Sequence, residues 1–284
     1  MNNYLIVTDT TSAMNLEIAK KHDIALVPLS VVINGKEFKD LIEITNDVLY
    51  EKLREGLVPT TSQPSVGYVT ELMEKWKTEN YDAIIVLTCS SDLSGTNHTF
   101  HMVKKQLEMD NVYIVDTRSV GAPIMDGAIR AKEMANEGKD IIEILKMLDM
   151  KYQNQFSFLY PETLTQLKKG GRVSPLAANM ASLLKIKPLL YLKEDGSVVD
   201  RFGMARTEGK VIQLCVDKFR DLNVNSLTNK LYILHADNAK GALQAEKMLK
   251  AVFDDIECEI NELPSVLTCH GGLGCVAIQS TLKI

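Results

Sequence analysis

The alternation of apolar and polar positions divides the chain into two stretches with different patterns. Over about the first 150 residues, short apolar runs alternate with longer runs of helical spacing. The pattern predicts strands at 5–8, 24–33, 83–88 and 112–115, and helices at 46–55, 66–79, 96–108 and 122–136. Such an alternation is typical of a mostly parallel sheet with helices on its faces. Asn34-Gly35 predicts a tight turn and a small hairpin within this stretch.

The second stretch begins near residue 156. It predicts strands at 156–160, 188–192, 198–201, 231–235, 257–262 and 274–278, and helices near 163–169, 175–184, 208–221 and 239–252. Glu194-Asp195-Gly196 predicts a hairpin turn between two of these strands. We therefore expect a mixed or antiparallel sheet with helices on it. A length of 284 residues favours two domains. We predict an N-terminal α/β domain at 1–155 and a C-terminal α/β domain at 156–284.

Composition narrows the classes of function. The formal net charge of −5 argues against nucleic-acid binding, which needs clustered Lys and Arg on a basic face. The first residues carry no basic leader, and no apolar run reaches the roughly 18 residues that a membrane-spanning helix needs. The five cysteines are odd in number and contain no Cys-x-x-Cys pair. We therefore expect no disulfide framework, a cytoplasmic location, and a core position for Cys89 at the end of an apolar strand.

Two hydroxyl-rich segments are the first candidates for a site. Thr60–Ser65 reads as a loop that enters a helix with Ser65 as its N-cap, and Ser90–Thr96 lies between a buried strand and a helix. Both end where unpaired helix N–H groups and the positive end of the helix dipole face outward. Together they predict a site for a small anion, at the carboxyl edge of the sheet. Helix capping alone is the competing interpretation, and the residues by themselves do not identify the anion.

Two glycine-containing segments follow in the second stretch. In Leu167–Ser174, the lysines are typical of a helix end, with Gly170 as the left-handed C-cap, but this leaves Gly171-Arg172 unexplained. In Thr268–Cys275, glycines surround His270 and allow a close approach of backbone or ligand. A structural hydrogen bond is the other role for a single histidine. Cys269, His270 and Cys275 lack a second pair of ligands, so we do not predict a zinc site.

Several blocks of the chain together match a known family in order and in spacing. They are Val7-Thr8-Asp9-Thr10-Thr11-Ser12, Thr61-Ser62-Gln63-Pro64-Ser65, Ser90-Ser91-Asp92-Leu93-Ser94-Gly95-Thr96, Asp116-Thr117-Arg118-Ser119, Leu167–Ser174, Ile186-Lys187-Pro188-Leu189-Leu190 and His270-Gly271. On these blocks, which extend from end to end, the chain resembles the DegV family of bacterial fatty-acid-binding proteins. Members serve as the acyl-carrying subunit of fatty acid kinase.

The resemblance implies two α/β domains with a long-chain fatty acid enclosed between them, and no other cofactor or metal. Carried over by position, it implies that the fatty acid carboxylate is held by a set of hydroxyls, backbone N–H groups and one imidazole: Thr61, Ser62, Ser94, Gly95, His270 and Gly271. One segment departs from the family pattern. The family usually has Gly-Pro-Gly where this chain has Gly272-Leu273-Gly274, and the missing proline predicts a looser turn beside His270.

The resemblance also implies a carrier without catalytic residues of its own. The sequence has no Gly-x-x-x-x-Gly-Lys-Ser/Thr, Gly-x-Gly-x-x-Gly or Gly-x-Ser-x-Gly motif. ATP and metal would therefore come with a separate ATP-dependent fatty acid kinase subunit. Arg172 and Arg206 are candidates for its docking surface, with solvated surface arginines as the alternative. Transient contact with a membrane surface is compatible with such a carrier. The residues alone equally allow an enzyme that binds a small phosphorylated metabolite in the Ser/Thr loops.

Overall fold

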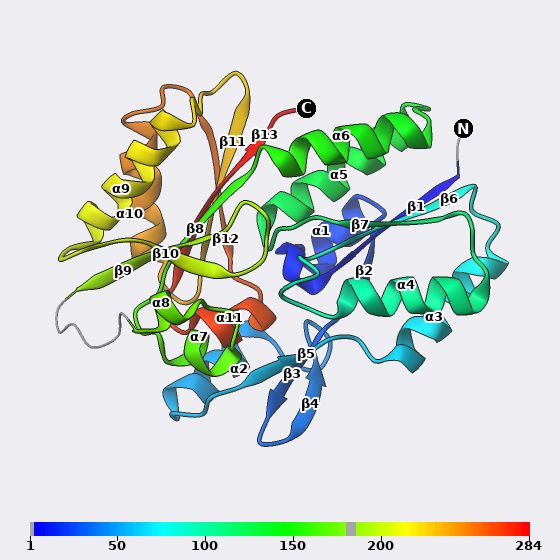
Figure 1. The fold of residues 1–284 in the computed structure, drawn as a ribbon, viewed down its shortest axis with the longest axis horizontal. Coiled ribbons are helices and arrows are strands. Elements are labelled where there is room, and N and C mark those ends of the chain that lie inside the picture. Colours follow the sequence, from blue (N-terminus) through cyan, green and yellow to red (C-terminus); the bar gives the residue numbers. More distant parts are fainter. Residues whose placement is uncertain (1–2, 180–185) are drawn as a thin grey trace.

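The computed structural model describes residues 3–179 and 186–284, which form a mixed α/β structure (Figure 1). In the first half, β1 (Tyr4–Asp9), β2 (Ala25–Val27), β6 (Ala83–Thr88) and β7 (Val112–Asp116) form a parallel sheet in the order β2-β1-β6-β7. Helices α3 (Val66–Thr78) and α4 (Thr96–Leu107) pack together on one of its faces, and α5 (Ala122–Asn136) packs on β1. Every residue of β6 is buried, as expected for a central strand covered on both faces.

The second half contains a mixed sheet. Its strands are β8 (Phe156–Tyr160), β9 (Lys187–Leu192), β10 (Val199–Ala205), β11 (Asn229–His235), β12 (Glu257–Glu262) and β13 (Val276–Leu282). Their order is β10-β9-β8-β13-β11-β12, and only the β11–β12 pair is parallel in this described sheet. Helices α9 (Glu208–Asp221) and α10 (Ala239–Lys250) cover one face. Strand β13 lies between β8 and β11, although it follows both in the chain.

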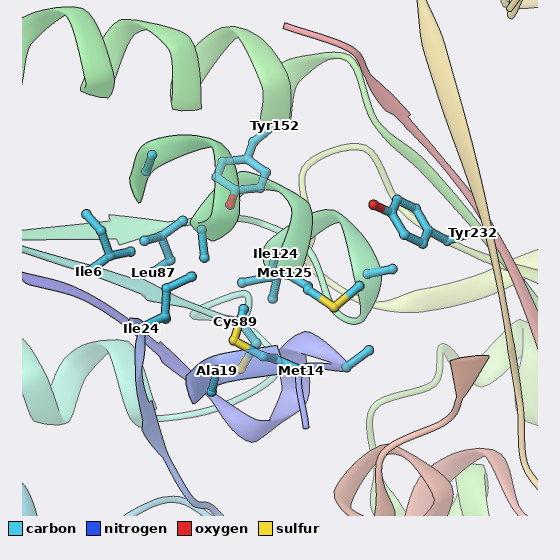
Figure 2. Packing of buried hydrophobic residues seen from close by; sticks show 14 of the residues in the cluster. Ile6, Met14, Ala19, Ile24, Leu87, Cys89, Ile124, Met125, Tyr152 and Tyr232 are labelled. Carbon is cyan, nitrogen blue, oxygen red and sulfur yellow. The ribbon is translucent and has the colours of Figure 1, made fainter. Parts of the chain in front are cut away.

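Helices α5 and α6 (Ile141–Gln153) lie between the two sheets and join them through one hydrophobic cluster. In Figure 2, Met125 on α5 lies between Met14 and Tyr232 of β11. Beside this cluster, Asp126 accepts a hydrogen bond from the Tyr232 hydroxyl (2.6 Å) and pairs with the buried Lys151 of α6 (2.5 Å). The cluster contains residues from both sides of position 155, and the division of the chain into domains there stays a prediction.

A small antiparallel sheet completes the described structure. Its strands are β3 (Ser30–Ile33), β4 (Lys36–Lys39) and β5 (Thr60–Ser62), in the order β4-β3-β5, and α2 (Asn46–Arg54) follows β4. The predicted turn at Asn34-Gly35 is present, with positive φ at both residues. The short helix α11 (Ser265–Gly271) packs against β3 and β5, so the second half of the chain contacts this sheet. Other short helices are η1 (Thr10–Ser12), α1 (Leu16–Lys21), α7 (Thr165–Gly170) and α8 (Pro175–Ala178).

The structure corrects several predicted elements. The apolar run at 24–33 is two strands in two different sheets, separated at Pro28, whose missing N–H interrupts a ladder. Helices α1 and α6 were not predicted from the sequence. For α6 a signal was present, because Asp140 and Glu143 form a capping box at its first turn. The helix predicted at 175–184 is helical at Pro175–Ala178, and its positions 180–184 lie outside the described residues. The last strand begins at Val276, since Gly274 has a φ of 78°.

No helix in the described ranges is long and apolar enough to cross a membrane.

Candidate ligand-binding site

A largely apolar cavity lies where the carboxyl edge of the parallel sheet meets the mixed sheet and α11. It encloses about 1030 Å³ of space not filled by atoms, part of it open to solvent. From the first half, its lining comes from β5 and from the loops after β1, β6 and β7, at residues that include Thr11, Cys89, Leu93 and Gly121. From the second half it comes from β8 to β11, β13, α7 and α11, at residues that include Phe158, Leu167, Leu192, Leu234, Leu267 and Ala277.

The lining of the cavity contains every predicted carboxylate-binding residue. Thr61, Ser62, Ser94, Gly95, His270 and Gly271 all line the cavity, together with Gln63 and Arg172. The prediction that hydroxyl loops meet at a sheet edge therefore holds for Ser90–Thr96, which connects β6 to α4. It is wrong for Thr60–Ser62, which is not a loop but strand β5 of the small antiparallel sheet. The alternating side chains of a strand leave Thr60 exposed and turn Thr61 inward.

Thr61 and His270 are in direct contact. The Thr61 hydroxyl lies 2.9 Å from Nε2 of His270, across 209 positions of sequence. His270 belongs to the last turn of α11, whereas the sequence placed it in a glycine-rich turn. Burial, and then the nearby charge of Arg172, lower the pKa of His270 to about 4, so its imidazole is neutral at physiological pH.

Gly170 makes room for the His270 ring. A Cβ atom at Gly170 would lie 2.2 Å from Nδ1 of His270, which is shielded from solvent and has no hydrogen-bond partner among the described residues. The left-handed C-cap of α7 is Gly171, with a φ of 71°, and not Gly170 as the sequence suggested. The two glycines therefore have different roles: Gly171 ends the helix, and Gly170 allows the close approach of His270.

The loop before α4 supplies a hydroxyl and free backbone N–H groups. Ser94 Oγ lies 2.9 Å from the Thr96 hydroxyl. Among the described residues, the N–H groups of Gly95, Asn97 and His98 have no acceptor, as is usual in a first helical turn. Gly95 also permits a close contact, because a Cβ atom there would lie 1.8 Å from Oε1 of Gln63.

Gln63 holds the two hydroxyl segments together, and sequence analysis did not single it out. Its Nε2 donates a hydrogen bond to the Thr99 hydroxyl of α4 (2.8 Å). The buried carboxylate of Asp9 has a similar role, since it accepts hydrogen bonds from the N–H groups of Thr11 (2.8 Å) and Cys89 (3.1 Å). Thr11 and Cys89 both line the cavity, so Cys89 is buried as predicted but is also part of the cavity wall. The block Val7–Ser12 was the available signal for Asp9 and Thr11.

The two predicted docking arginines are far apart. Arg172 lies at the edge of the cavity, where its Nε donates to the carbonyl of Leu93 (3.1 Å) and its Nη1 to that of Gly170 (2.5 Å). Its backbone carbonyl accepts from Val199, the first residue of β10. Arg206 follows the last residue of β10, about 20 Å away at roughly 3.3 Å per residue. Arg206 does not line the cavity.

The turn after His270 is anchored despite the missing proline. Gly272 and Gly274 both have a φ of 78°, and their N–H groups donate to the carbonyls of Thr268 and Ala236 (2.8 Å each). Two backbone hydrogen bonds therefore hold this turn, and its greater looseness relative to a turn with proline stays a prediction. Cys269 and Cys275 are buried free thiols. In residues 3–179 and 186–284, no group of three or more His, Cys, Asp or Glu side chains is arranged to hold a metal ion.

Comparison with known proteins identifies the family of this chain. Residues 3–283 match the family model described as "Uncharacterised protein, DegV family". A protein of Thermotoga maritima named "Fatty acid-binding protein" is 33% identical over 278 residues, with 95% of each chain covered. A Thermus thermophilus structure described as "Fatty Acid Binding of a DegV family Protein" is 29% identical, with a TM-score of 0.89 over 99% of this chain and 100% of that one. A Bacillus subtilis structure described as "DegV, a fatty acid binding protein" is 27% identical, with a TM-score of 0.86 and complete coverage of both chains.

Proposed function

The chain belongs to the DegV family, and from that premise we propose that it binds one long-chain fatty acid in its apolar cavity. We propose further that it presents the carboxylate to a separate ATP-dependent kinase subunit, which phosphorylates it to the acyl phosphate. The observation that carries the proposal is an apolar cavity beside a cluster of uncharged hydrogen-bonding groups, centred on the contact between Thr61 and His270.

The apolar lining fits a long acyl chain energetically. A saturated chain of about sixteen carbons gains roughly 12 kcal/mol of gross burial, at about 0.8 kcal/mol per methylene. The ordering of the chain and its lost translational freedom offset much of this gain. The same lining argues against the alternative of a small phosphorylated metabolite, because such a substrate would leave most of the apolar surface uncovered.

The carboxylate needs several donors, since a buried carboxylate without partners is very costly. We assign the proton of neutral His270 to Nε2, from which it bonds to Thr61 Oγ1 and leaves the Thr61 proton free for the ligand. Ser94, Ser62 and the free N–H of Gly95 would complete the set. Gly271 lines the cavity within the last turn of α11, where an N–H group bonds to the preceding turn, so it is the weakest donor of the predicted set.

Uncharged donors suit a carboxylate that has to react. A bidentate arginine would hold it strongly and weaken its attack on a γ-phosphate. Arg172 lies at the edge of the cavity with its guanidinium already bonded to two backbone carbonyls. In our proposal it faces the docked kinase subunit near the head group. Arg206, at the other end of β10, would belong to a separate part of that surface. The carrier would work in the cytoplasm and exchange its ligand by transient contact with a membrane surface.

Native mass spectrometry of the purified protein tests the first part of the proposal. We expect a co-purifying mass equal to that of a sixteen- or eighteen-carbon acid, because burial of that chain is strongly favourable. A co-purifying phosphorylated metabolite would contradict the proposal and support the alternative enzyme.

Substitution of Thr61 tests the head-group assignment. Thr61→Val keeps the shape but removes the hydroxyl, and it leaves Nε2 of His270 without its partner. We expect acid affinity to fall by about 10- to 100-fold, which corresponds to roughly 1–3 kcal/mol for a lost buried hydrogen bond. Ser94→Ala should have a similar effect, and either change should abolish formation of acyl phosphate by an added kinase subunit and ATP. Thr60→Val, at the exposed neighbouring position, is the matched control. Unchanged turnover in Thr61→Val would refute the assignment.

A further inference from the structure

Asp40 is a buried carboxylate that the proposed head-group site does not use. It directly follows β4, is 0% exposed, and neither of its carboxylate oxygens has a well-formed hydrogen bond among the described residues. Removing an ionised carboxylate from water without full compensation carries a large free-energy cost. A group of this kind in the interior therefore requires an explanation.

The groups around Asp40 compensate its charge only in part. The hydroxyls of Thr10 and Ser265 and the N–H groups of Leu41 and Val266 face it and lower its pKa, but burial outweighs them and raises the pKa to about 6. The hydroxyl of Ser265 donates its single proton to Oδ1 of Asn46 (2.7 Å), which explains why it does not satisfy Asp40.

Three segments of the cavity wall meet at Asp40. Thr10 precedes Thr11, which lines the cavity from η1. The backbone N–H of Asp40 donates to the carbonyl of Leu29 (2.9 Å), and Leu29 lines the cavity as well. On the third side, Val266 lines the cavity from the first turn of α11. Asp40 thus lies directly behind the wall at the point where η1, Leu29 and α11 join.

Asp40 also lies at the end of α11 opposite to His270. No side chain caps the amino end of this helix, where Pro264 is the N-cap residue. The titratable group of α11 that faces Asp40 is Cys269, whose thiol pKa is raised by burial and then by Asp40. On the η1 side, Asp9 has both oxygens bonded to Thr11 and Cys89. The pKa of Asp40 is governed by burial and hydrogen-bonding groups, and not by a neighbouring cation.

We propose that Asp40 is a positioning residue that makes the wall of the ligand cavity respond to pH. Its ionised form favours opening of the junction between η1, Leu29 and α11, because opening lets water reach the carboxylate. Its protonated form needs no such solvation and favours the closed junction. The expected consequence is slower release of the bound acid at low pH, and this consequence rests on the proposed function.

The direction and size of the effect follow from linkage. The closed form binds the proton with a pKa of about 6, and a solvated aspartate has an ordinary value of 3.8. Acidification therefore favours the closed form, and the opening equilibrium should fall about tenfold between pH 7.5 and pH 5. His270, with a pKa of about 4, stays largely neutral over this range and does not produce the effect.

Stopped-flow release of cis-parinaric acid into phosphatidylcholine vesicles tests the proposal. We expect release from the wild-type protein to slow about tenfold from pH 7.5 to pH 5. Asp40→Asn should release slowly at both pH values, at close to the wild-type rate at pH 5. Any titration of the probe's own carboxyl group is common to both proteins. Asp47→Asn, at an exposed position of α2, is the matched control and should behave as wild type. Wild-type pH dependence in Asp40→Asn would overturn the proposal.

Amide hydrogen exchange of the wild-type protein gives a test that needs neither ligand nor variant. After correction for the intrinsic pH dependence of exchange, protection of the α11 amides should rise about tenfold between pH 7.5 and pH 5. Unchanged or lower protection would overturn the role of Asp40. If cis-parinaric acid fails to bind the wild-type protein while protection still rises, the proposed function fails and the role of Asp40 stands. If Asp40→Asn fails to fold, the exchange experiment decides.

Discussion

Two buried ionisable groups lie at the two ends of α11, His270 in its last turn and Asp40 beside its first turn, and burial shifts their pKa values in opposite directions. At the carboxyl end, burial lowers the pKa of His270 to about 4, and at the amino end it raises the pKa of Asp40 to about 6. Both groups are thereby shifted towards their neutral forms. The difference between them is their partners. Nε2 of His270 contacts the Thr61 hydroxyl at 2.9 Å and only its Nδ1 is without a described partner, whereas neither carboxylate oxygen of Asp40 has a well-formed hydrogen bond. The short helix α11, seen beside α7 in Figure 1, thus connects the contact between His270 and Thr61 to the incompletely compensated carboxylate of Asp40.

The two ends also make opposite contributions to stability as pH changes. His270 has an ordinary pKa of 6.5, so its contribution is present above pH 6.5 and is lost as pH falls towards 4. Asp40 has an ordinary pKa of 3.8, so its contribution is present at low pH and is lost as pH rises through 6. Between pH 4 and pH 6 the changes that His270 and Asp40 make to the unfolding free energy largely cancel. The stability of the wild-type protein therefore shows neither change.

The largest expected effect is on the pH dependence of stability when one of the two groups is removed. Each single variant should show the pH dependence that the remaining group produces. Between pH 7 and pH 4.5, Asp40→Asn should lose about 2 kcal/mol of unfolding free energy, because His270 alone remains. Over the same range His270→Gln should gain about 2 kcal/mol, because Asp40 alone remains. Urea denaturation at each pH measures both slopes. Asp47→Asn should keep the wild-type slope. Identical slopes in the two single variants would show that the ends of α11 do not differ in this way.

Gly170→Ala should disturb only the His270 end. The added Cβ would lie 2.2 Å from Nδ1 of His270, so the ring has to move and its contact with Thr61 is weakened. We expect a loss of about 1–3 kcal/mol of unfolding free energy, as for other overpacked interiors. Gly67→Ala is the control, since a Cβ there meets nothing within 4 Å. Equal stability of the two alanine variants would exclude a tight fit at Gly170.

Ser265→Ala should act on the Asp40 end and has the smallest expected effect. It removes the hydrogen bond to Asn46 and one of the groups that lower the pKa of Asp40. The unfolding free energy should fall by about 1 kcal/mol, and the pKa of Asp40, followed by the ¹³C resonance of its carboxyl group, should rise further. In the Asp40→Asn background only the loss of stability should remain. An unchanged pKa of Asp40 in Ser265→Ala would show that the Ser265 hydroxyl does not act on this carboxylate.

The same two ends show what could be predicted from the sequence. His270, Thr61 and Ser94 lie in short blocks of hydroxyls and glycines that are unusual for either core or linker, so their chemistry was visible locally. Asp40 follows Lys36–Lys39, a mostly polar strand, and nothing local distinguishes it from a solvated aspartate. Its importance arises from burial by Thr10 and Ser265, which are distant in sequence. Burial of a polar residue is a tertiary property, and no pattern along the chain reports it.

The helices and strands were also predictable only where the signal is local in the sequence. Strands β6, β8 and β12 coincide with their predicted ranges, because each is bounded by clear polar or turn residues. The run at 24–33 was predicted as one strand because its apolar residues continue across Pro28, and only pairing with two different sheets separates β2 from β3. The fold class was predictable from periodicity. The contact of Gly170 with His270 was not, since it depends on how α7 and α11 pack.

The separation of Thr61 and His270 along the chain has a consequence for the time at which the protein becomes able to bind. At a synthesis rate of about 5–20 residues per second, the 209 positions between them correspond to roughly 10–40 seconds on the ribosome. Strand β13, which lies inside the mixed sheet between β8 and β11, is made later still. A nascent chain therefore presents Thr61 and Ser94 long before it has a closed cavity. If the proposed function holds, loading with fatty acid has to follow release of β13 from the ribosome, because an acid that binds earlier would meet Thr61 and Ser94 without His270.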